Sequence, residues 1–214
     1  NNTVIGNVIT TATSDSYGIF LNGTAVDEAL INNNITSTLA WNIFDTSGDT
    51  RSNYLIYNNT WGQIEWANNG SLGFPRNLTV NVTNDKSLVL GTNFFIGNNT
   101  IAVNTSAFSP LLINSSANIT LKGLAFPSVE NVYKLDTYSK VAHTILRSGT
   151  NCNGTDCSIL SYDSATGVLT FNTTSFSSYS GHNNTMPVVE SIRVNSTDLT
   201  TNNTDQNLTA NVSL

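Results

Sequence analysis

The residues best suited to chemistry are asparagines followed two positions later by serine or threonine. The chain of 214 residues contains 18 such triplets, roughly twice the number that its 33 Asn, 30 Thr and 24 Ser would give by chance. Each triplet is an acceptor for an N-linked glycan, although strands alternating Asn with Thr would also generate triplets through composition alone. The pattern predicts a glycosylated surface. The acceptor asparagines are Asn1, Asn22, Asn34, Asn58, Asn69, Asn77, Asn81, Asn98, Asn104, Asn114, Asn118, Asn153, Asn172, Asn183, Asn195, Asn202, Asn207 and Asn211.

Two cysteines, Cys152 and Cys157, lie close together in a chain that has no others. A glycine among the four residues between them would allow a tight loop. An even number of cysteines at this spacing predicts one local disulfide and an oxidising compartment. Free thiols and a metal site are the alternatives. A metal site would need further ligands, and neither His143 nor His182 has helical or hairpin spacing to the cysteines.

The best candidates for enzyme chemistry are Asp45 and Asp49, which flank a turn just before Arg51. Acidic calcium ligands beside a basic residue would suit a polysaccharide lyase, but Asp and Gly are also ordinary turn residues. Asp27 and Glu28 fall in another loop, where we expect them to be solvated. The sequence has no nucleophile-elbow, phosphate-loop or zinc-protease motif. It therefore predicts no catalysis and no cofactor, with Asp45 and Asp49 as the sole calcium candidate.

Three tryptophans lie within one stretch of the sequence. Trp41 aligns with Tyr17 in a repeated pattern, so we expect it in the core. Trp61 and Trp66 are either core residues or exposed rings that stack against sugars. The tryptophans thus leave a carbohydrate-binding module open as an alternative function.

Composition restricts the classes of protein to consider. Only 10% of the residues are charged and the net charge is −6, which argues against nucleic-acid binding because that needs a basic surface. A glycan coat would supply the solvation that charged side chains usually provide. No apolar run is long enough to span a membrane. The chain begins at Asn1 without a signal-like segment, so we expect a mature, cut or partial chain.

The N-terminal third contains an internal repeat. A short apolar strand, an Asn-rich turn, a second strand and a polar loop recur with offsets near 25 residues. A unit this small cannot bury its apolar face alone, so we expect the units to stack at the parallel-strand spacing of ~4.8 Å. Asn suits the turns because it tolerates left-handed conformations. The matching segments are Val4–Ile9, Leu30–Ile35 and Leu55–Thr60 for the first element, and Tyr17–Leu21, Trp41–Asp45 and, more weakly, Gly62–Trp66 for the second.

The segment Tyr17-Gly-Ile-Phe-Leu21, followed by Leu30-Ile-Asn-Asn-Asn-Ile35, resembles the repeats of right-handed parallel β-helix proteins. Such repeats are typical of NosD-type proteins, pectate lyases and large secreted archaeal-type surface glycoproteins. The resemblance covers residues 2–66 directly and extends by a looser pattern to about residue 125. It implies an all-β fold, a right-handed parallel β-helix or solenoid, and it indicates function much less specifically.

The rest of the chain is expected to form two further parts. Residues 126–181 are interpreted as a β cap that holds the disulfide and a hairpin of Ile159–Tyr162 with Val168–Asn172. Residues 182–214 are interpreted as a linker followed by strands that resemble the start of an immunoglobulin-like module. Because so few residues cannot complete such a sandwich, Pro187–Leu214 is a candidate strand donor between subunits. Residues 1–125 would then hold the β-helix rungs.

Together these features predict an extracellular structural or adhesive glycoprotein at a cell surface, as a subunit or segment of a fibre or surface layer. The expected partners are further copies or neighbouring domains of the same protein, covalent N-glycans and cell-surface polysaccharide. A carbohydrate-binding module that uses Trp61 and Trp66 is one alternative. A β-helix polysaccharide lyase is the other, and it would need convergent ionisable groups that are scarce in this sequence.

Overall fold

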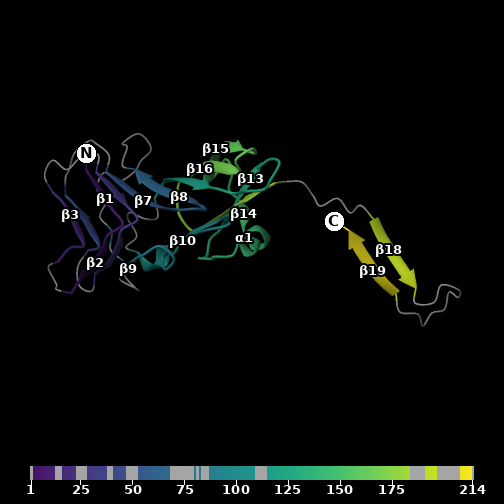
Figure 1. Ribbon diagram of the computed structural model, residues 1–214, viewed down its shortest axis with the longest axis horizontal. Helices are drawn as coiled ribbons and strands as arrows, with labels where there is room; N and C mark the ends of the chain where they lie inside the picture. Colours follow the sequence, from purple (N-terminus) through teal and green to yellow (C-terminus); the bar gives the residue numbers. More distant parts are fainter. Residues whose placement is uncertain are drawn as a thin grey trace. The chain divides into compact units, whose positions relative to one another are not determined.

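The computed structural model describes residues 2–12, 16–22, 28–37, 41–46, 53–67, 80, 82, 87–108, 115–183, 191–196 and 208–213. The chain divides into two compact units, Asn1–Asn183 and Asn184–Leu214. The described residues form a mainly β protein with several mixed sheets and one short α-helix (Figure 1). No helix in this described part is long and apolar enough to cross a membrane.

The N-terminal repeats pair in parallel, in the register that their spacing predicts. Val4 lies opposite Leu30, and Leu30 lies opposite Leu55. Ile9 lies opposite Ile35 in the same way. The paired strands are β1 (Thr3–Ile5), β4 (Ala29–Ile31) and β7 (Tyr54–Asn59), then β2 (Val8–Thr11) and β5 (Asn34–Ser37), and lastly β3 (Ile19–Leu21) and β6 (Ile43–Asp45). We call β1–β3 the first layer and β4–β6 the second layer.

The turn that joins the first two strands of each layer contains a left-handed residue. Gly6 has φ +66° in the first layer, and Asn32 has φ +50° at the equivalent position of the second. Glycine adopts this conformation without steric cost, and asparagine is among the few other residues that tolerate it. The prediction that asparagine supports these turns is confirmed at Asn32.

The third predicted repeat departs from this pattern. The alignment places Gly62–Trp66 on a further layer, but β8 (Gly62–Ala67) turns back and pairs antiparallel with β7. Asn59 lies opposite Gly62, so Thr60 and Trp61 form a two-residue hairpin loop. The prediction of a third stacked copy is therefore confirmed for its first element, β7, and wrong for its second element, because the tight turn allows β8 to bond directly to β7.

Antiparallel strands also cover the second layer elsewhere. β9 (Ser87–Leu88) pairs antiparallel with β5, and Val80 forms an antiparallel bridge with Ile43 of β6. The parallel pairing therefore ends at β5, β6 and β7, where an antiparallel neighbour follows in each case. These pairings establish mixed sheets.

Two larger sheets contain most of the remaining strands. The order in the seven-stranded sheet is β1-β4-β7-β8-β12-β16-β15, with β12 (Ala117–Leu121), β15 (Cys157–Asp163) and β16 (Val168–Thr173). The order in the five-stranded sheet is β10-β11-β17-β13-β14, with β10 (Phe94–Gly97), β11 (Thr100–Val103), β13 (Asn131–Leu135), β14 (Thr150–Asn151) and β17 (Ser178–His182). A 3₁₀ turn (Thr105–Ala107) and the helix α1 (Ala142–Ser148) complete this unit.

Aromatic contacts join the two larger sheets into one core. Tyr57 stacks on Phe94 with 4.4 Å between ring centroids, and Phe171 packs on Tyr179 at 5.8 Å. Burial raises the pKa of Tyr57, whose hydroxyl donates a 2.7 Å hydrogen bond to the carbonyl of Asn33. The buried face of the seven-stranded sheet carries Leu55, Tyr57, Ile64, Trp66, Ile119, Leu121, Leu169 and Phe171.

The second unit contains one described hairpin. β18 (Ser191–Ser196) and β19 (Leu208–Ser213) pair antiparallel with each other, with Ser191 opposite Ser213. They form a separate two-stranded sheet. Two strands alone are marginally stable in water.

Candidate glycan-bearing surface and neighbouring sites

The acceptor asparagines whose side chains the structure describes all reach solvent. Asn22, Asn98 and Asn153 are exposed, whereas the other six with described side chains are half-buried: Asn34, Asn58, Asn104, Asn118, Asn172 and Asn183. Asn195 and Asn211 lie in β18 and β19, where the structure describes the backbone. Asn1, Asn69, Asn77, Asn81, Asn114, Asn202 and Asn207 lie outside the described residues.

Other asparagines of the described chain are buried. Asn33, Asn42, Asn53, Asn93 and Asn99 are buried, and none of them is the acceptor asparagine of an Asn-x-Ser/Thr triplet. Each of these side chains makes a hydrogen bond to a backbone N–H or carbonyl group. Asn99 donates from Nδ2 to the Gly181 carbonyl at 2.9 Å and accepts from the Gly181 N–H at 2.9 Å. Within the described chain, no acceptor side chain is buried, and every buried asparagine is a non-acceptor.

Three acceptor asparagines share the open face of the seven-stranded sheet. Asn118 of β12 lies between Glu65 of β8 and Asn172 of β16 in the strand register. Asn58 of β7 lies opposite Gln63 on the same side. Side chains directly opposite on neighbouring strands are about 5 Å apart at Cβ. The face therefore presents closely spaced amide groups, while the intervening residues point into the core.

The predicted disulfide is present between Cys152 and Cys157, with 5.3 Å between the Cα atoms. The residues between them form a closed loop in which Gly154 has φ +84°. The Cys152 carbonyl accepts the N–H groups of Asp156 and Cys157 at 3.1 Å and 3.0 Å. The small spacer and its glycine are therefore sufficient for the closure that the sequence predicts.

An ion pair ties this loop to the five-stranded sheet. Lys134 of β13 donates from Nζ to Asp156 at 3.0 Å and to the Ser175 hydroxyl at 3.1 Å. Partial burial lowers the pKa of Lys134, but the hydrogen bond to Asp156 and nearby negative charges outweigh this effect. The net result is a raised pKa, so the lysine is charged at neutral pH.

The acidic candidates do not lie where the sequence places them. Glu28 is buried, not solvated: it accepts the Asn2 N–H at 2.8 Å and Asn2 Nδ2 at 3.1 Å. Asp45 is also buried and accepts Nδ2 of Asn53 at 2.8 Å. Asp27, Asp49 and Arg51 lie outside the described residues. Among the residues described, no group of three or more His, Cys, Asp and Glu could hold a metal ion.

The tryptophans divide between interior and surface. Trp66 is 3% exposed and packs on Phe94 and Phe176, so it cannot serve as a surface ring for sugar stacking. Trp61, at the tip of the β7–β8 hairpin, is 42% exposed. Trp41 is half-buried, and its ring contacts Phe44.

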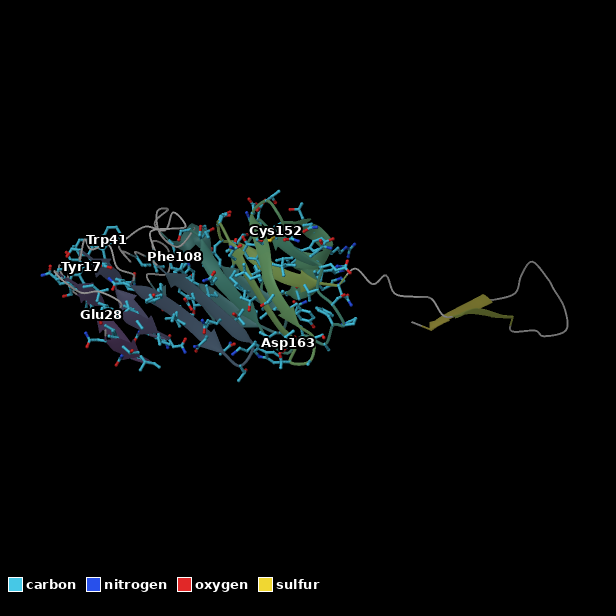
Figure 2. The ribbon with its side chains drawn as sticks, turned by 90° about the horizontal axis from the view of Figure 1, so that it is seen from above. Tyr17, Glu28, Trp41, Phe108, Cys152 and Asp163 are labelled. Atoms are coloured by element: carbon cyan, nitrogen blue, oxygen red, sulfur yellow. A yellow bond between two sulfur atoms is a disulfide. The ribbon has the colours of Figure 1, made fainter. Side chains whose placement is uncertain are left out.

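A stack of aromatic rings on β3 and β6 is a feature that the sequence reading missed. Tyr17 stacks on Phe44 at 4.8 Å and on Phe20 at 5.3 Å, with interplanar angles of 11° and 26°. Phe20 and Phe44 are register partners, and Tyr17 and Phe20 remain exposed. Figure 2 shows Tyr17, Trp41 and Glu28 at the opposite end of the first unit from Cys152 and Asp163. The matching Phe20 and Phe44 in the repeats were the available signal.

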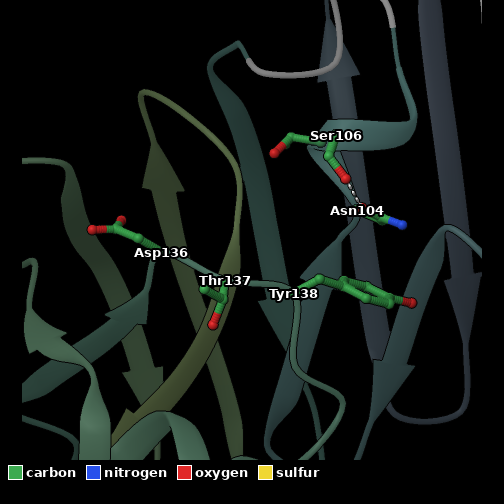
Figure 3. Close-up of a pocket in the computed structure, with 6 residues that line it drawn as sticks. Asn104, Ser106, Asp136, Thr137 and Tyr138 are labelled. Atoms are coloured by element: carbon green, nitrogen blue, oxygen red, sulfur yellow. Dashed lines mark hydrogen bonds between the residues drawn. The ribbon is translucent and has the colours of Figure 1, made fainter. Parts of the chain in front are cut away.

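One surface pocket of about 310 Å³ lies beside an acceptor asparagine (Figure 3). The Ser106 hydroxyl donates to Asn104 Oδ1 at 2.7 Å, and Asp136 is exposed and pairs with Lys134 at 3.5 Å. The lining residues are Asn104, Thr105, Ser106, Asp136, Thr137 and Tyr138.

In comparisons with protein-family models, curated proteins and solved structures, no match to this chain was found. Function must therefore be argued from the residues and their arrangement.

Proposed function

We propose that this chain is an extracellular structural or adhesive glycoprotein, a subunit or segment of a cell-surface fibre or surface layer that performs no catalysis. The observation that carries the proposal is the separation of the asparagines. Every described acceptor side chain reaches solvent, whereas none of the five buried asparagines is an acceptor. If the triplets arose from composition alone, there would be no reason for acceptor asparagines to avoid buried positions.

Three further features support an extracellular structural role. The disulfide favours an oxidising compartment. Only 10% of the residues are charged, so sugars would supply the solvation of the surface. The parallel layers support the finer proposal of a right-handed β-helix segment, and the β18–β19 hairpin supports the start of an immunoglobulin-like module.

Glycopeptide mapping of the native protein by mass spectrometry tests this proposal. We expect glycans on the most exposed acceptors, Asn22, Asn98 and Asn153. Asn151 is exposed but lies outside a triplet, so it should be unmodified and serves as the internal control. Native protein with all of its described acceptors unmodified would contradict the proposal.

Negative-stain electron microscopy of the native material tests the assembly. We expect regular filaments or sheets, and loss of this order when Pro187–Leu214 is deleted. Isolated particles in the native sample would contradict a fibre or surface layer. Unchanged order after the deletion would show that this segment is not the connecting strand donor.

Carbohydrate binding is a second candidate, and the exposure of Trp61 favours it. The Trp61 ring lies near Gly123, where a Cβ would come within 3.8 Å of the ring atom Cζ3. The other candidate ring, Trp66, is buried. Fluorescence titration with polysaccharides should show a shift in the native protein that Trp61→Ala removes, and absence of any shift would dismiss this function.

A further inference from the structure

We infer that the outer edge of the first layer is a docking surface for one more repeat of the same strand–turn–strand pattern, stacked in parallel on β1, β2 and β3. This inference stands independently of the proposed glycoprotein function. Each of the three strands is the terminal member of its sheet in the described structure. The surface is continuous with the established interface between the first and second layers.

The inward-facing residues of the first layer are more exposed than their register partners in the second layer. Leu30, Ile35 and Ile43 of the second layer are 0% exposed. Their register partners in the first layer are Val4, Ile9 and Ile19, which are half-buried although they pack against the same core. The pattern of side chains is the same in both layers, so the difference reflects the neighbour that only the second layer has on both sides.

The same edge exposes large apolar side chains. Val8 is 80% exposed and Ile5 61%, and the Phe20 ring is 48% exposed. Phe20 ends the aromatic stack that Phe44 continues in the second layer. An added layer with an aromatic residue at the equivalent position would extend the stack, and apolar surface of this kind marks an interaction site.

At one corner of the stack, a side chain of the second layer accepts hydrogen bonds from the first layer. Asn33 Oδ1 accepts the Asn7 N–H at 3.1 Å and Asn7 Nδ2 at 3.0 Å. Asn7 holds in the first layer the position that Asn33 holds in the second. Its amide is therefore placed to receive the corresponding N–H of an added layer.

The opposite side of the stack indicates which partner the outer edge of the first layer can bind. There, β8, β9 and Val80 pair antiparallel with β7, β5 and Ile43, so that side is already covered. A second copy of this chain cannot present that covered side to β1–β3. The partner that matches the strand register is instead a strand–turn–strand repeat with apolar inward-facing residues and an Asn or Gly in its turn.

The test is a full-length chain in which a copy of residues 28–53 is placed directly before Asn2, which keeps the 26-residue spacing between Asn2 and Glu28. We expect amide exchange in β1–β3 to slow by at least about tenfold and the unfolding midpoint to rise by about 5 °C. The matched control carries Leu30→Pro and Ile35→Pro in the added copy only. Proline cannot donate to a strand ladder, so this control should show neither effect.

Measurements on the unextended chain keep the inference testable if the extended chain fails to fold. Amides of β1–β3 should exchange faster than those of β4–β6 at every protein concentration. Equal protection of the two layers in dilute protein would overturn the inference, because the edge would already be covered. Protection of β1–β3 that rises with concentration would also overturn it, because a second copy would then be the occupant.

Discussion

At the scale of single residues, asparagine explains more of this protein than any other side chain. Buried asparagines pair with backbone groups that have no strand partner, and every acceptor asparagine with a described side chain reaches solvent. Asn98 and Asn99 are adjacent members of the two classes in the β10–β11 loop, because Gly97 lies opposite Thr100. This adjacency allows the two roles to be compared at one place in the fold.

Asn99→Ala should lower the free energy of unfolding by about 3 kcal/mol, because it leaves both Gly181 groups unpaired and forces alanine to φ +48°. Asn98→Ala should change it by less than about 0.5 kcal/mol in protein made without glycans. Chemical denaturation of both variants measures the difference. Similar losses for the two would show that Asn99 has no special structural role.

Lys134→Met should destabilise the protein by about 1 kcal/mol at pH 7, because Asp156 and Ser175 lose their charged donor. The folded-state pKa of Lys134 is raised above its ordinary 10.5. The stabilisation is therefore fully present below pH 10.5 and is lost as the pH rises through the folded-state pKa. Urea titrations of both proteins at several pH values check this, and a difference that vanishes well below pH 10 would contradict it.

At the scale of elements, the layers and the hairpins have different origins. The layers follow from repeated patterns, since Ile9 and Ile35 occupy equivalent places in parallel strands. The hairpin of β7 and β8 follows from a two-residue turn that overrides the weak third repeat. The predicted hairpin of β15 and β16 forms as expected, with Ile159 opposite Phe171.

Ile35→Ala should cost about 3 kcal/mol of stability, because it creates a cavity at a fully buried position. Ile9→Ala at the equivalent place in the first layer should cost about 1 kcal/mol, because Ile9 is only half-buried. Equilibrium unfolding in urea compares the pair. An equal loss at both positions would mean that the first layer is covered in solution.

At the scale of the whole molecule, strands that are distant in sequence share sheets. β12 pairs with β8 and with β16, so strands on both sides of residue 125 lie in the seven-stranded sheet. β17 lies between β11 and β13 in the five-stranded sheet. The β18–β19 hairpin belongs to the second unit and forms its own sheet.

A chain truncated after Asn183 should unfold in one cooperative transition within about 2 °C of the full-length midpoint, because every described strand pair of the first unit remains. Truncation after Ser175 should abolish the folded state, since it removes β17 from the middle of its sheet. Circular dichroism during heating distinguishes the two. A large loss of stability in the longer fragment would show that the first unit depends on the second.

The sequence alone determined the features that local chemistry or short repeats encode. These are the strand register of the first two layers, the left-handed Asn32, the Cys152–Cys157 loop and the acceptor triplets. Each depends on residues within one or two repeat lengths, where periodicity and spacing leave few alternatives.

The tertiary structure decided what depends on distant partners. It turned β8 back onto β7 and set β12 beside it, formed α1 within the segment expected to be a β cap, and buried Trp66 and Glu28. It also left the outer edge of the first layer without a strand partner in the described structure. These outcomes depend on which strands far apart in sequence meet across the core, and the burial of a side chain follows from its neighbours in space, whatever its own type.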